Sequence, residues 1–468
     1  MFIGRQSELQ FLEEKYSAKG GQLVVLYGRR RVGKTETLRK FCEGKEHVFY
    51  ACTESPDELQ LTDFSERMLQ KGLPAARYVK RFEGWAEALH SITELPADGK
   101  KLLVIDEFPY MVKGNSAIPS LLQNLWDEGL KDENVMIILC GSALSFIEKE
   151  VLVEKNPLYG CATGILKMAE MSFYDAIQFV PNYSALDKIA TYATLGGIPH
   201  YLKQFDDALP LGENIRKNIL SRGSILYSEV EFLMRQELRE TAIYNAIIEA
   251  VALGNTKLND IHLKTLIEKT KLSAYLKSLT DLGILRRELP VSDGVKEQAN
   301  VQRGLYSVTD NFFRFWYAFV FPNLSELEAG DSNGIWTHVV EPMFDEYISR
   351  IFENVCRQYL RELNRKKVLP FYFTKIGRWW DKSNEIDIMA TDSKKQNFLL
   401  GECKYKNSAV TLGELTALRN KWQPKNANCK LHYCSFSKGG FSEEVTLASK
   451  ADEVLVVTAE DVVGLIKG

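Results

Sequence analysis

The chain has few cysteines, the residues that form the disulfides of small secreted proteins and bind the metal ions of small zinc-stabilised folds. Its 468 residues include only eight cysteines, and no two of them form a C-x-x-C pair. A disulfide framework or a zinc cluster is therefore not expected, and reduced thiols in the cytoplasm are the simplest interpretation. The N-terminal segment MFIGRQSE also lacks the apolar stretch of a signal peptide.

Long apolar runs and a strong excess of one charge are missing as well. The longest aromatic-apolar run spans residues 312–322; it is too short to cross a membrane and contains Arg314, so no membrane partner is expected. The formal net charge of −3 does not mark the whole chain as a nucleic-acid binder. Over residues 341–468, however, basic residues slightly outnumber acidic ones, so a polyanion is most expected to bind there.

A glycine-rich loop follows the first apolar stretch. Residues 23–27 predict a buried strand, and the pattern G-x-x-x-x-G-K-T then runs from Gly28 to Thr35. Glycine lets the backbone turn tightly and present its N–H groups to phosphate oxygens, and a helix that begins near Lys34 adds the positive end of its dipole. The pattern predicts an ATP site in which Lys34 contacts the outer phosphates and the Thr35 hydroxyl binds Mg²⁺.

An acidic pair follows a second apolar run, at residues 102–105. Asp106, at the carboxyl end of the predicted strand, can hold the water shell of Mg²⁺, and Glu107 can polarise the attacking water. Such a pair is common on plain protein surfaces. Its distance downstream of the glycine-rich loop makes Asp106 a candidate metal ligand and Glu107 a candidate catalytic base.

Two further segments are expected near the nucleotide. Gly4 and Arg5 precede a predicted helix and can fold over the adenine ring, although an ordinary amphipathic helix explains the segment equally well. Ser142 follows the apolar run 135–140 and can contact the terminal phosphate; the alternative is a strand-ending turn. The predicted nucleotide-binding residues are Gly4, Arg5, Gly28, Arg29, Arg30, Arg31, Val32, Gly33, Lys34, Thr35, Glu36 and Ser142.

Strands alternate with helices through this region, which predicts a parallel sheet covered on both faces. The segments FIGRQSE, LYGRRRVGKT, LLVIDEFPYM, IILCGS, NPLYG and LGGIPHYL together resemble the archaeal-type P-loop ATPases, which are relatives of the AAA+ and STAND ATPases. The resemblance covers about residues 1–235. It implies ATP hydrolysis with Mg²⁺, and a helical lid that carries the glycine-proline signature at 196–199.

The chain departs from this family at one place. The segment after NPLYG usually carries arginine, and here it contains Cys161 and Ala162. An arginine there would stabilise charge on the transferred phosphoryl group. Hydrolysis is therefore expected to be slow, or the role passes to another cation such as Arg222 or Lys155.

Residues 243–310 predict three helices and two strands, which resembles the winged helix that follows the ATPase in this family. Basic and acidic residues nearly balance there, so packing or protein docking is at least as well supported as DNA binding. The aromatic run that begins at Phe312 has helical spacing and predicts core packing.

The C-terminal region predicts the order α-β-β-β-α-β with a last strand over residues 454–458, and it carries a second set of charged residues. Glu402 and Lys404 lie two positions apart on one predicted strand, so they project from the same face, and Asp387 on the neighbouring strand can converge with them. Two carboxylates can bind Mg²⁺ or Mn²⁺, and a lysine can orient or deprotonate a water for attack on a phosphodiester. A cross-strand ion pair would give the same pattern without chemistry.

These residues resemble the core of the PD-(D/E)xK nuclease superfamily, over about residues 340–468. The resemblance implies Asp387, Glu402 and Lys404 as catalytic residues. It also implies Asp387, Glu402 and Glu353, on the preceding helix, as metal ligands. A binding-only remnant of such a nuclease remains an alternative.

The whole chain is expected to be an α/β protein of four parts. Residues 1–165 form a P-loop ATPase core, 166–240 a helical lid, 241–325 a winged helix, and 326–468 a nuclease-like domain. The expected function is ATP hydrolysis that gates a metal-dependent nuclease, with DNA favoured over RNA and with a homo-oligomer or partner protein left open. The alternative is an ATP-gated regulator or scaffold whose C-terminal domain only binds nucleic acid or a partner protein.

Overall fold

The chain divides into two compact units. The computed structural model describes residues 2–142, 146–148, 157–238, 240–291, 304–424, 428–451 and 454–465. The first unit comprises Met1–Met171 with Ile198–His200, and the second comprises Ser172–Gly197 with Tyr201–Gly468. The finer predicted division into four parts stays a prediction.

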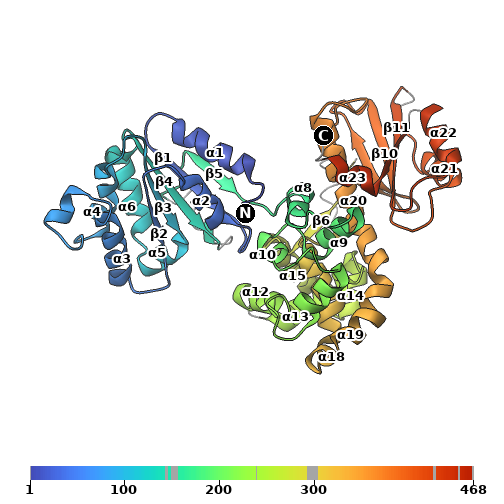
Figure 1. Cartoon of the computed structure of the whole chain (residues 1–468), viewed down its shortest axis with the longest axis horizontal. Helices are drawn as coiled ribbons and strands as arrows, with labels where there is room; N and C mark the ends of the chain where they lie inside the picture. The colour runs from blue at the N-terminus through green and yellow to red at the C-terminus, as the bar shows by residue number, and fades with distance from the viewer. Residues whose placement is uncertain are drawn as a thin grey trace. The chain divides into compact units, whose positions relative to one another are not determined.

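A five-stranded parallel sheet forms the centre of the first unit (Figure 1). The strands are β1 (Gln22–Tyr27), β2 (His47–Ala51), β3 (Lys101–Asp106), β4 (Val135–Gly141) and β5 (Gly164–Lys167), in the spatial order β2-β3-β4-β1-β5. Because the strands are parallel, their carboxyl ends meet at one edge, where the glycine-rich loop and the acidic pair both begin. The predicted parallel sheet is confirmed.

Helices cover both faces of this sheet. Leu23 and Val25 pack on the side of α3–α6, whereas Val24 and Leu26 are buried on the opposite side. Burial on both faces explains why the three inner strands, β1, β3 and β4, are apolar runs. Figure 1 shows α1 (Gln6–Ser17) and α2 (Lys34–Cys42) on one face of the sheet. It shows α3 (Asp57–Leu69), α4 (Trp85–His90), α5 (Phe108–Gly114) and α6 (Ile118–Leu125) on the other. Short 3-10 or π segments are η1 (Pro74–Arg77), η2 (Ser91–Glu94) and η3 (Trp126–Leu130).

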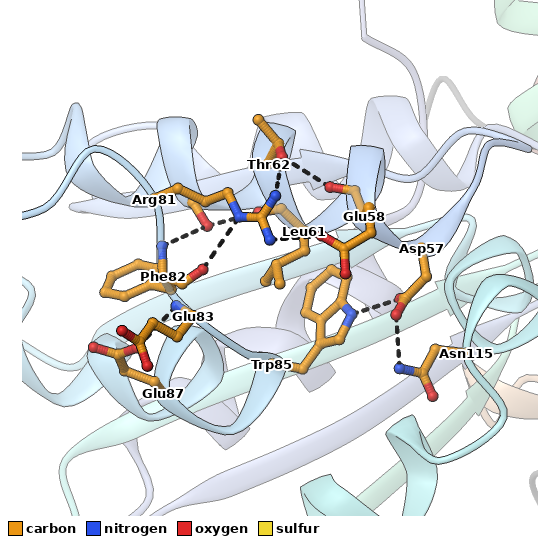
Figure 2. Close-up of polar contacts among 11 residues, drawn as sticks. Asp57, Glu58, Leu61, Thr62, Arg81, Phe82, Glu83, Trp85, Glu87 and Asn115 are labelled. Atoms are coloured by element: carbon orange, nitrogen blue, oxygen red, sulfur yellow. Dashed lines mark hydrogen bonds and ion pairs between the residues drawn. The ribbon is translucent and has the colours of Figure 1, made fainter.

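Side-chain hydrogen bonds connect α3 with α4 and α5 (Figure 2). Arg81, in the loop that leads to α4, donates to the Glu58 carboxylate of α3 over 2.6 Å. The Asp57 carboxylate, in the first turn of α3, accepts from Trp85 Nε1 (2.7 Å) and from Asn115 Nδ2 (3.0 Å). Asn115 ends α5, the helix that begins directly after the acidic pair. The layer that supports the acidic pair is therefore held together by side-chain hydrogen bonds as well as by apolar packing.

The second unit begins with a helical part and a two-stranded antiparallel sheet, β6 (Leu285–Glu288) and β7 (Leu305–Val308). The three helices and the two strands predicted for residues 243–310 are present, as α13, α14, α15, β6 and β7; much of the loop between the strands lies outside the described residues. The winged-helix interpretation stays a prediction. The helical segments are α8 (Phe173–Ala176), η5 (Ile177–Phe179), α9 (Ala185–Leu195), α10 (Pro199–Leu202), α11 (Leu211–Ile215), η6 (Arg216–Leu220), α12 (Glu229–Glu237), α13 (Thr241–Ala252), α14 (Leu258–Thr265) and α15 (Lys269–Asp281).

The predicted aromatic run is part of the core. Phe312, Phe315 and Trp316 are buried, and Trp316 Nε1 donates to the carbonyl oxygen of Tyr227 over 2.8 Å. The prediction of core packing is confirmed. The segments here are α17 (Asn311–Phe315), η8 (Trp316–Val320), η9 (Phe321–Asn323), α18 (Leu324–Glu328), α19 (Ser332–Ile335) and η10 (Trp336–Val340).

A mixed five-stranded sheet follows, in the order β12-β11-β10-β9-β8. β9 pairs antiparallel with both of its neighbours, β8 and β10. β11 pairs parallel with both of its neighbours, β10 and β12. The predicted elements are all present, with α22 and α23 in addition, so the predicted α/β fold is confirmed. The elements are α20 (Glu341–Arg365), β8 (Lys375–Trp380), β9 (Glu385–Thr391), β10 (Asn397–Lys404), α21 (Leu412–Asn420), β11 (Lys430–Ser437), α22 (Glu443–Ala451), β12 (Leu455–Thr458) and α23 (Ala459–Gly464).

Candidate functional site

The glycine-rich loop connects β1 directly to α2. A Cβ atom at Gly28 would lie 2.4 Å from the carbonyl oxygen of Met168, and Gly33 has φ +95°. Both positions therefore require glycine, the first for space and the second for backbone conformation. The predicted strand–loop–helix arrangement is confirmed, with β1 ending at Tyr27 and α2 beginning at Lys34.

Lys34 lies buried at the centre of the loop. Its side-chain Nζ donates to the carbonyl oxygens of Gly28 (2.9 Å) and Arg29 (3.1 Å). Burial lowers the pKa of the Lys34 ammonium, and acidic neighbours such as Glu107 oppose this effect. Phosphate oxygens can replace the carbonyl oxygens with stronger, charge-assisted hydrogen bonds.

The start of α2 and the end of β3 meet through one hydrogen bond. Thr35 Oγ1 donates to Asp106 Oδ2 over 2.7 Å, although β4 lies between β3 and β1 in the sheet. The other oxygen, Asp106 Oδ1, accepts from the backbone N–H of Glu107 over 3.0 Å. A hydroxyl beside a carboxylate offers the oxygen ligands that Mg²⁺ prefers, so the residues present fit this cation.

Glu107 sits in a constrained position at the start of α5. Its φ is +52°, and its Oε2 accepts hydrogen bonds from Ser142 Oγ (2.9 Å) and from the Ser142 backbone N–H (3.3 Å). Ser142 therefore contacts the predicted catalytic base; its predicted contact with the terminal phosphate stays a prediction. No local sequence pattern indicates this contact, because it joins the ends of two different strands.

Arg5 attaches the N-terminal segment to the loop. Its guanidinium is buried, donates to the carbonyl oxygen of Val32 over 2.6 Å and pairs with Glu8 over 2.7 Å. Of the six non-glycine residues with positive φ in the described chain, three lie at this site: Arg5, Arg31 and Glu107. Such conformations cost energy and concentrate at functional sites, which supports this edge of the sheet as the nucleotide site.

The remaining predicted residues lie in the same segments. Gly4 also has positive φ, beside Arg5. Arg29, Arg30 and Arg31 are half-buried in the loop, and Glu36 is exposed in the first turn of α2. The sequence pattern therefore placed these residues together correctly, while their individual roles stay predictions.

The glycine-proline signature also reaches the loop. Within the first unit, Pro199 Cγ lies 3.7 Å from the position of a Cβ atom at Gly33. Cys161, where the family resemblance led us to expect an arginine, is buried. Of the two cations considered as substitutes, Arg222 pairs with Glu328 over 3.2 Å in the second unit, and Lys155 lies outside the described residues.

Known proteins match both halves of the chain. Residues 2–205 match the family model of an ATPase domain predominantly from Archaea. An uncharacterized protein of Methanocaldococcus jannaschii, MJECL04, is 34% identical over 407 residues, which cover 87% of this chain and 88% of the relative. This chain belongs to the same family of archaeal-type P-loop ATPases. The ATPase also matches, over residues 316–416, a family of archaeal and bacterial proteins of unknown function.

Two further likenesses are narrower. An uncharacterized ATP-binding protein of the same organism, MJ0423, is 52% identical over 46 residues, covering 10% of this ATPase and 78% of that protein. The structure of a Walker-type ATPase of Pyrococcus abyssi shares the fold, with a TM-score of 0.51 and 20% identity over 68% of this chain and 96% of that one. Within the described residues, no helix combines the length and apolar character needed to cross a bilayer.

A second group of charged residues lies in the C-terminal sheet of this ATPase. The Glu402 carboxylate bonds to Lys404 Nζ through one oxygen and to Lys421 Nζ through the other, each over 2.7 Å. Asp387 Oδ2 accepts from the backbone N–H of Cys403 over 2.8 Å. The structure brings Asp387, Glu402 and Lys404 together as predicted, and it adds Lys421, which follows α21.

Glu353 of α20 faces the same group. Burial and the nearby Asp387 raise the pKa of Glu353, and burial and the nearby Glu402 raise the pKa of Asp387. Among the described residues, however, no three His, Cys, Asp or Glu side chains are grouped to hold a metal ion. The predicted metal set of Glu353, Asp387 and Glu402 is therefore not gathered in the described structure, and both Glu402 oxygens are bonded to lysines.

Proposed function

We propose that Mg²⁺-ATP hydrolysis in the first unit controls the access of DNA to the acidic group in the C-terminal sheet. The observation that carries the proposal is the presence of two separate sites in one chain. One joins Lys34, Thr35 and Asp106 at the glycine-rich loop. The other joins Asp387, Glu402 and Lys404 on adjacent strands.

In the first site, the loop and Lys34 would bind and orient the phosphates. The backbone N–H groups at the start of α2 and the buried ammonium supply fixed positive charge where the reaction increases negative charge. Thr35 and Asp106 would hold Mg²⁺, which when bound neutralises charge on the phosphate oxygens. Arg5, through its hydrogen bond to the Val32 carbonyl oxygen, would hold the N-terminal segment against the loop.

Glu107 would take the proton of the attacking water. Ser142 donates to one oxygen of its carboxylate and leaves the other available for that water. A base positioned by a second group contributes to proton transfer more effectively than a mobile side chain.

In the second site, Asp387 and Glu402 would supply oxygen ligands for Mg²⁺ or Mn²⁺, and Lys404 would orient the water that attacks a phosphodiester. Both carboxylates lie on adjacent antiparallel strands, so the sheet holds them at a fixed separation. For a cation to bind, Glu402 has to exchange a lysine contact for the metal.

The rival proposal is an ATP-gated regulator whose C-terminal domain binds DNA or a partner protein without cleaving it. Three observations favour it. Lys404 and Lys421 neutralise Glu402 over 2.7 Å each, and the described part of the chain holds no three-ligand metal group. The buried Cys161 in place of an arginine also favours slow ATP turnover, which suits a switch.

A cleavage assay separates the two proposals. The full chain is incubated with single- and double-stranded DNA and with RNA, in Mg²⁺ or Mn²⁺, with and without ATP. We expect DNA cleavage that Asp387→Asn lowers by at least about 100-fold, more than the roughly 10–100-fold of outer-shell changes. Asp392→Asn, in the turn between β9 and β10, is the matched control and should cleave normally. An ATPase that cleaves none of these substrates supports the regulator.

A further inference from the structure

A small cavity in the second unit has arginine as its most frequent lining residue. Its volume is about 70 Å³, and its walls come from β6 and β7, from α17 and α20, and from β8. Two carboxylates reach it, Glu288 from β6 and Glu353 from α20. Five guanidinium groups surround them, those of Arg286, Arg314, Arg350, Arg357 and Arg378, which we call the arginine pocket.

The two carboxylates are already shared among three of these arginines. Glu288 lies 2.8 Å from Arg286 and 3.8 Å from Arg378. Glu353 lies 3.4 Å from Arg378 and 3.8 Å from Arg357. Five positive charges against two negative ones leave the lining with a net excess of three, and the Glu385 carboxylate, which bonds to Arg378 from outside the lining, offsets one of them.

Arg314 and Arg350 account for most of the uncompensated charge. Among the described residues, neither side chain forms an ion pair or a hydrogen bond; Arg314 instead lies over the Tyr347 ring, 5.1 Å from its centre. Burial lowers the pKa of Arg314, and the nearby Arg350 and Arg286 lower it further. Like charges crowded in a partly desolvated site are unfavourable, and a bound anion removes the cost.

We propose that the arginine pocket binds a phosphate group of a nucleic-acid strand. The planar guanidinium fork matches the geometry of phosphate oxygens, and arginine is the preferred residue for such contacts. The cavity is small and has arginine side chains from several elements in its lining, which suits a compact anion such as one phosphate group.

The position of the pocket gives the bound phosphate a role. Glu353 lines the pocket and also lies beside Asp387, and Arg357 Nη1 donates to the Asp387 carbonyl oxygen over 3.1 Å. A strand held here by one phosphate would pass next to the acidic group of the C-terminal sheet. This role rests on the proposed function, whereas phosphate binding by the pocket does not.

The test is oligonucleotide binding by the full chain carrying Lys34→Ala, so that the glycine-rich loop does not contribute. Fluorescence anisotropy is measured at two salt concentrations, with inorganic phosphate as a competitor. We expect Arg314→Gln with Arg350→Gln to weaken binding at least about 10-fold and to reduce the salt dependence by one to two counterions. Arg350→Gln alone, at an exposed position that should not disturb folding, is expected to show part of this loss.

Arg365→Gln is the matched control, because Arg365 lies on the same helix and pairs with Glu362 outside the pocket. Equal binding by the control and the double variant would overturn the proposal. Arginine-dependent binding of inorganic phosphate with unchanged oligonucleotide binding would also overturn it, since the phosphate source would then be a free ion. Arginine-dependent binding without any cleavage supports the pocket and contradicts only the nuclease.

Discussion

Glu107→Gln is expected to lower kcat for ATP hydrolysis by roughly 10²–10⁴-fold, the usual contribution of a general base. Glutamine keeps the size of the side chain and can still accept hydrogen bonds from Ser142, so the start of α5 should be preserved. It cannot take a proton from water. ATP affinity should therefore change little, because Lys34 and the loop are untouched.

Phosphate release under single-turnover conditions and equilibrium ATP binding measure the two quantities separately. Glu43→Gln is the matched control, because Glu43 follows α2 at the surface and pairs with Lys40 over 2.6 Å. Full turnover in Glu107→Gln would show that another group activates the water. Loss of ATP binding in this variant would show that Glu107 holds the site together instead.

Lys34→Ala is expected to lower kcat/KM for ATP by at least about 100-fold. The ammonium can make two charge-assisted hydrogen bonds to phosphate oxygens, each worth about 1.5–3 kcal/mol. Alanine leaves the bound phosphates without this charge in a buried loop, where no water can approach easily to replace it. Both affinity and turnover should therefore fall.

The measurement is the concentration dependence of ATP hydrolysis, together with direct ATP titration. Lys40→Ala is the control on the same helix, since Lys40 is exposed and lies a turn and a half beyond the loop. Nucleotide affinity as high in Lys34→Ala as in Lys40→Ala would contradict the assignment of Lys34.

The sequence was sufficient to predict the first unit because its signals are local. The strand, the loop with glycine at both ends and the start of the helix are contiguous in the sequence. Glycine is required at position 28 for space and at position 33 for backbone conformation. β5 was not predicted, because its four residues form a short edge strand with every second side chain exposed. α22 was also missed, since its threonine and serine weaken the helical signal.

The contacts that complete the sites could not be predicted in the same way. Ser142 reaches Glu107 only because β3 and β4 are neighbours in the sheet, and Lys421 reaches Glu402 only because α21 folds back. Neither contact leaves a pattern in the local sequence.

The arginine pocket could not be predicted from the sequence either, because its charged residues are far apart along the chain. Its arginines extend from Arg286 to Arg378, and the residues around each of them carry a near balance of charge. The charge count over residues 341–468 therefore gave a small basic excess in a region that holds three of these arginines, but no sign of a defined pocket. Only the folded chain brings five guanidinium groups to two carboxylates.

The most direct test of the account is amide hydrogen exchange over residues 28–35, measured with and without Mg²⁺-ATP. The account predicts that ATP slows exchange in this segment, because the phosphates accept hydrogen bonds from its backbone N–H groups. The same protection should be lost in Lys34→Ala. Unchanged exchange in this loop at ATP concentrations that support hydrolysis would contradict it.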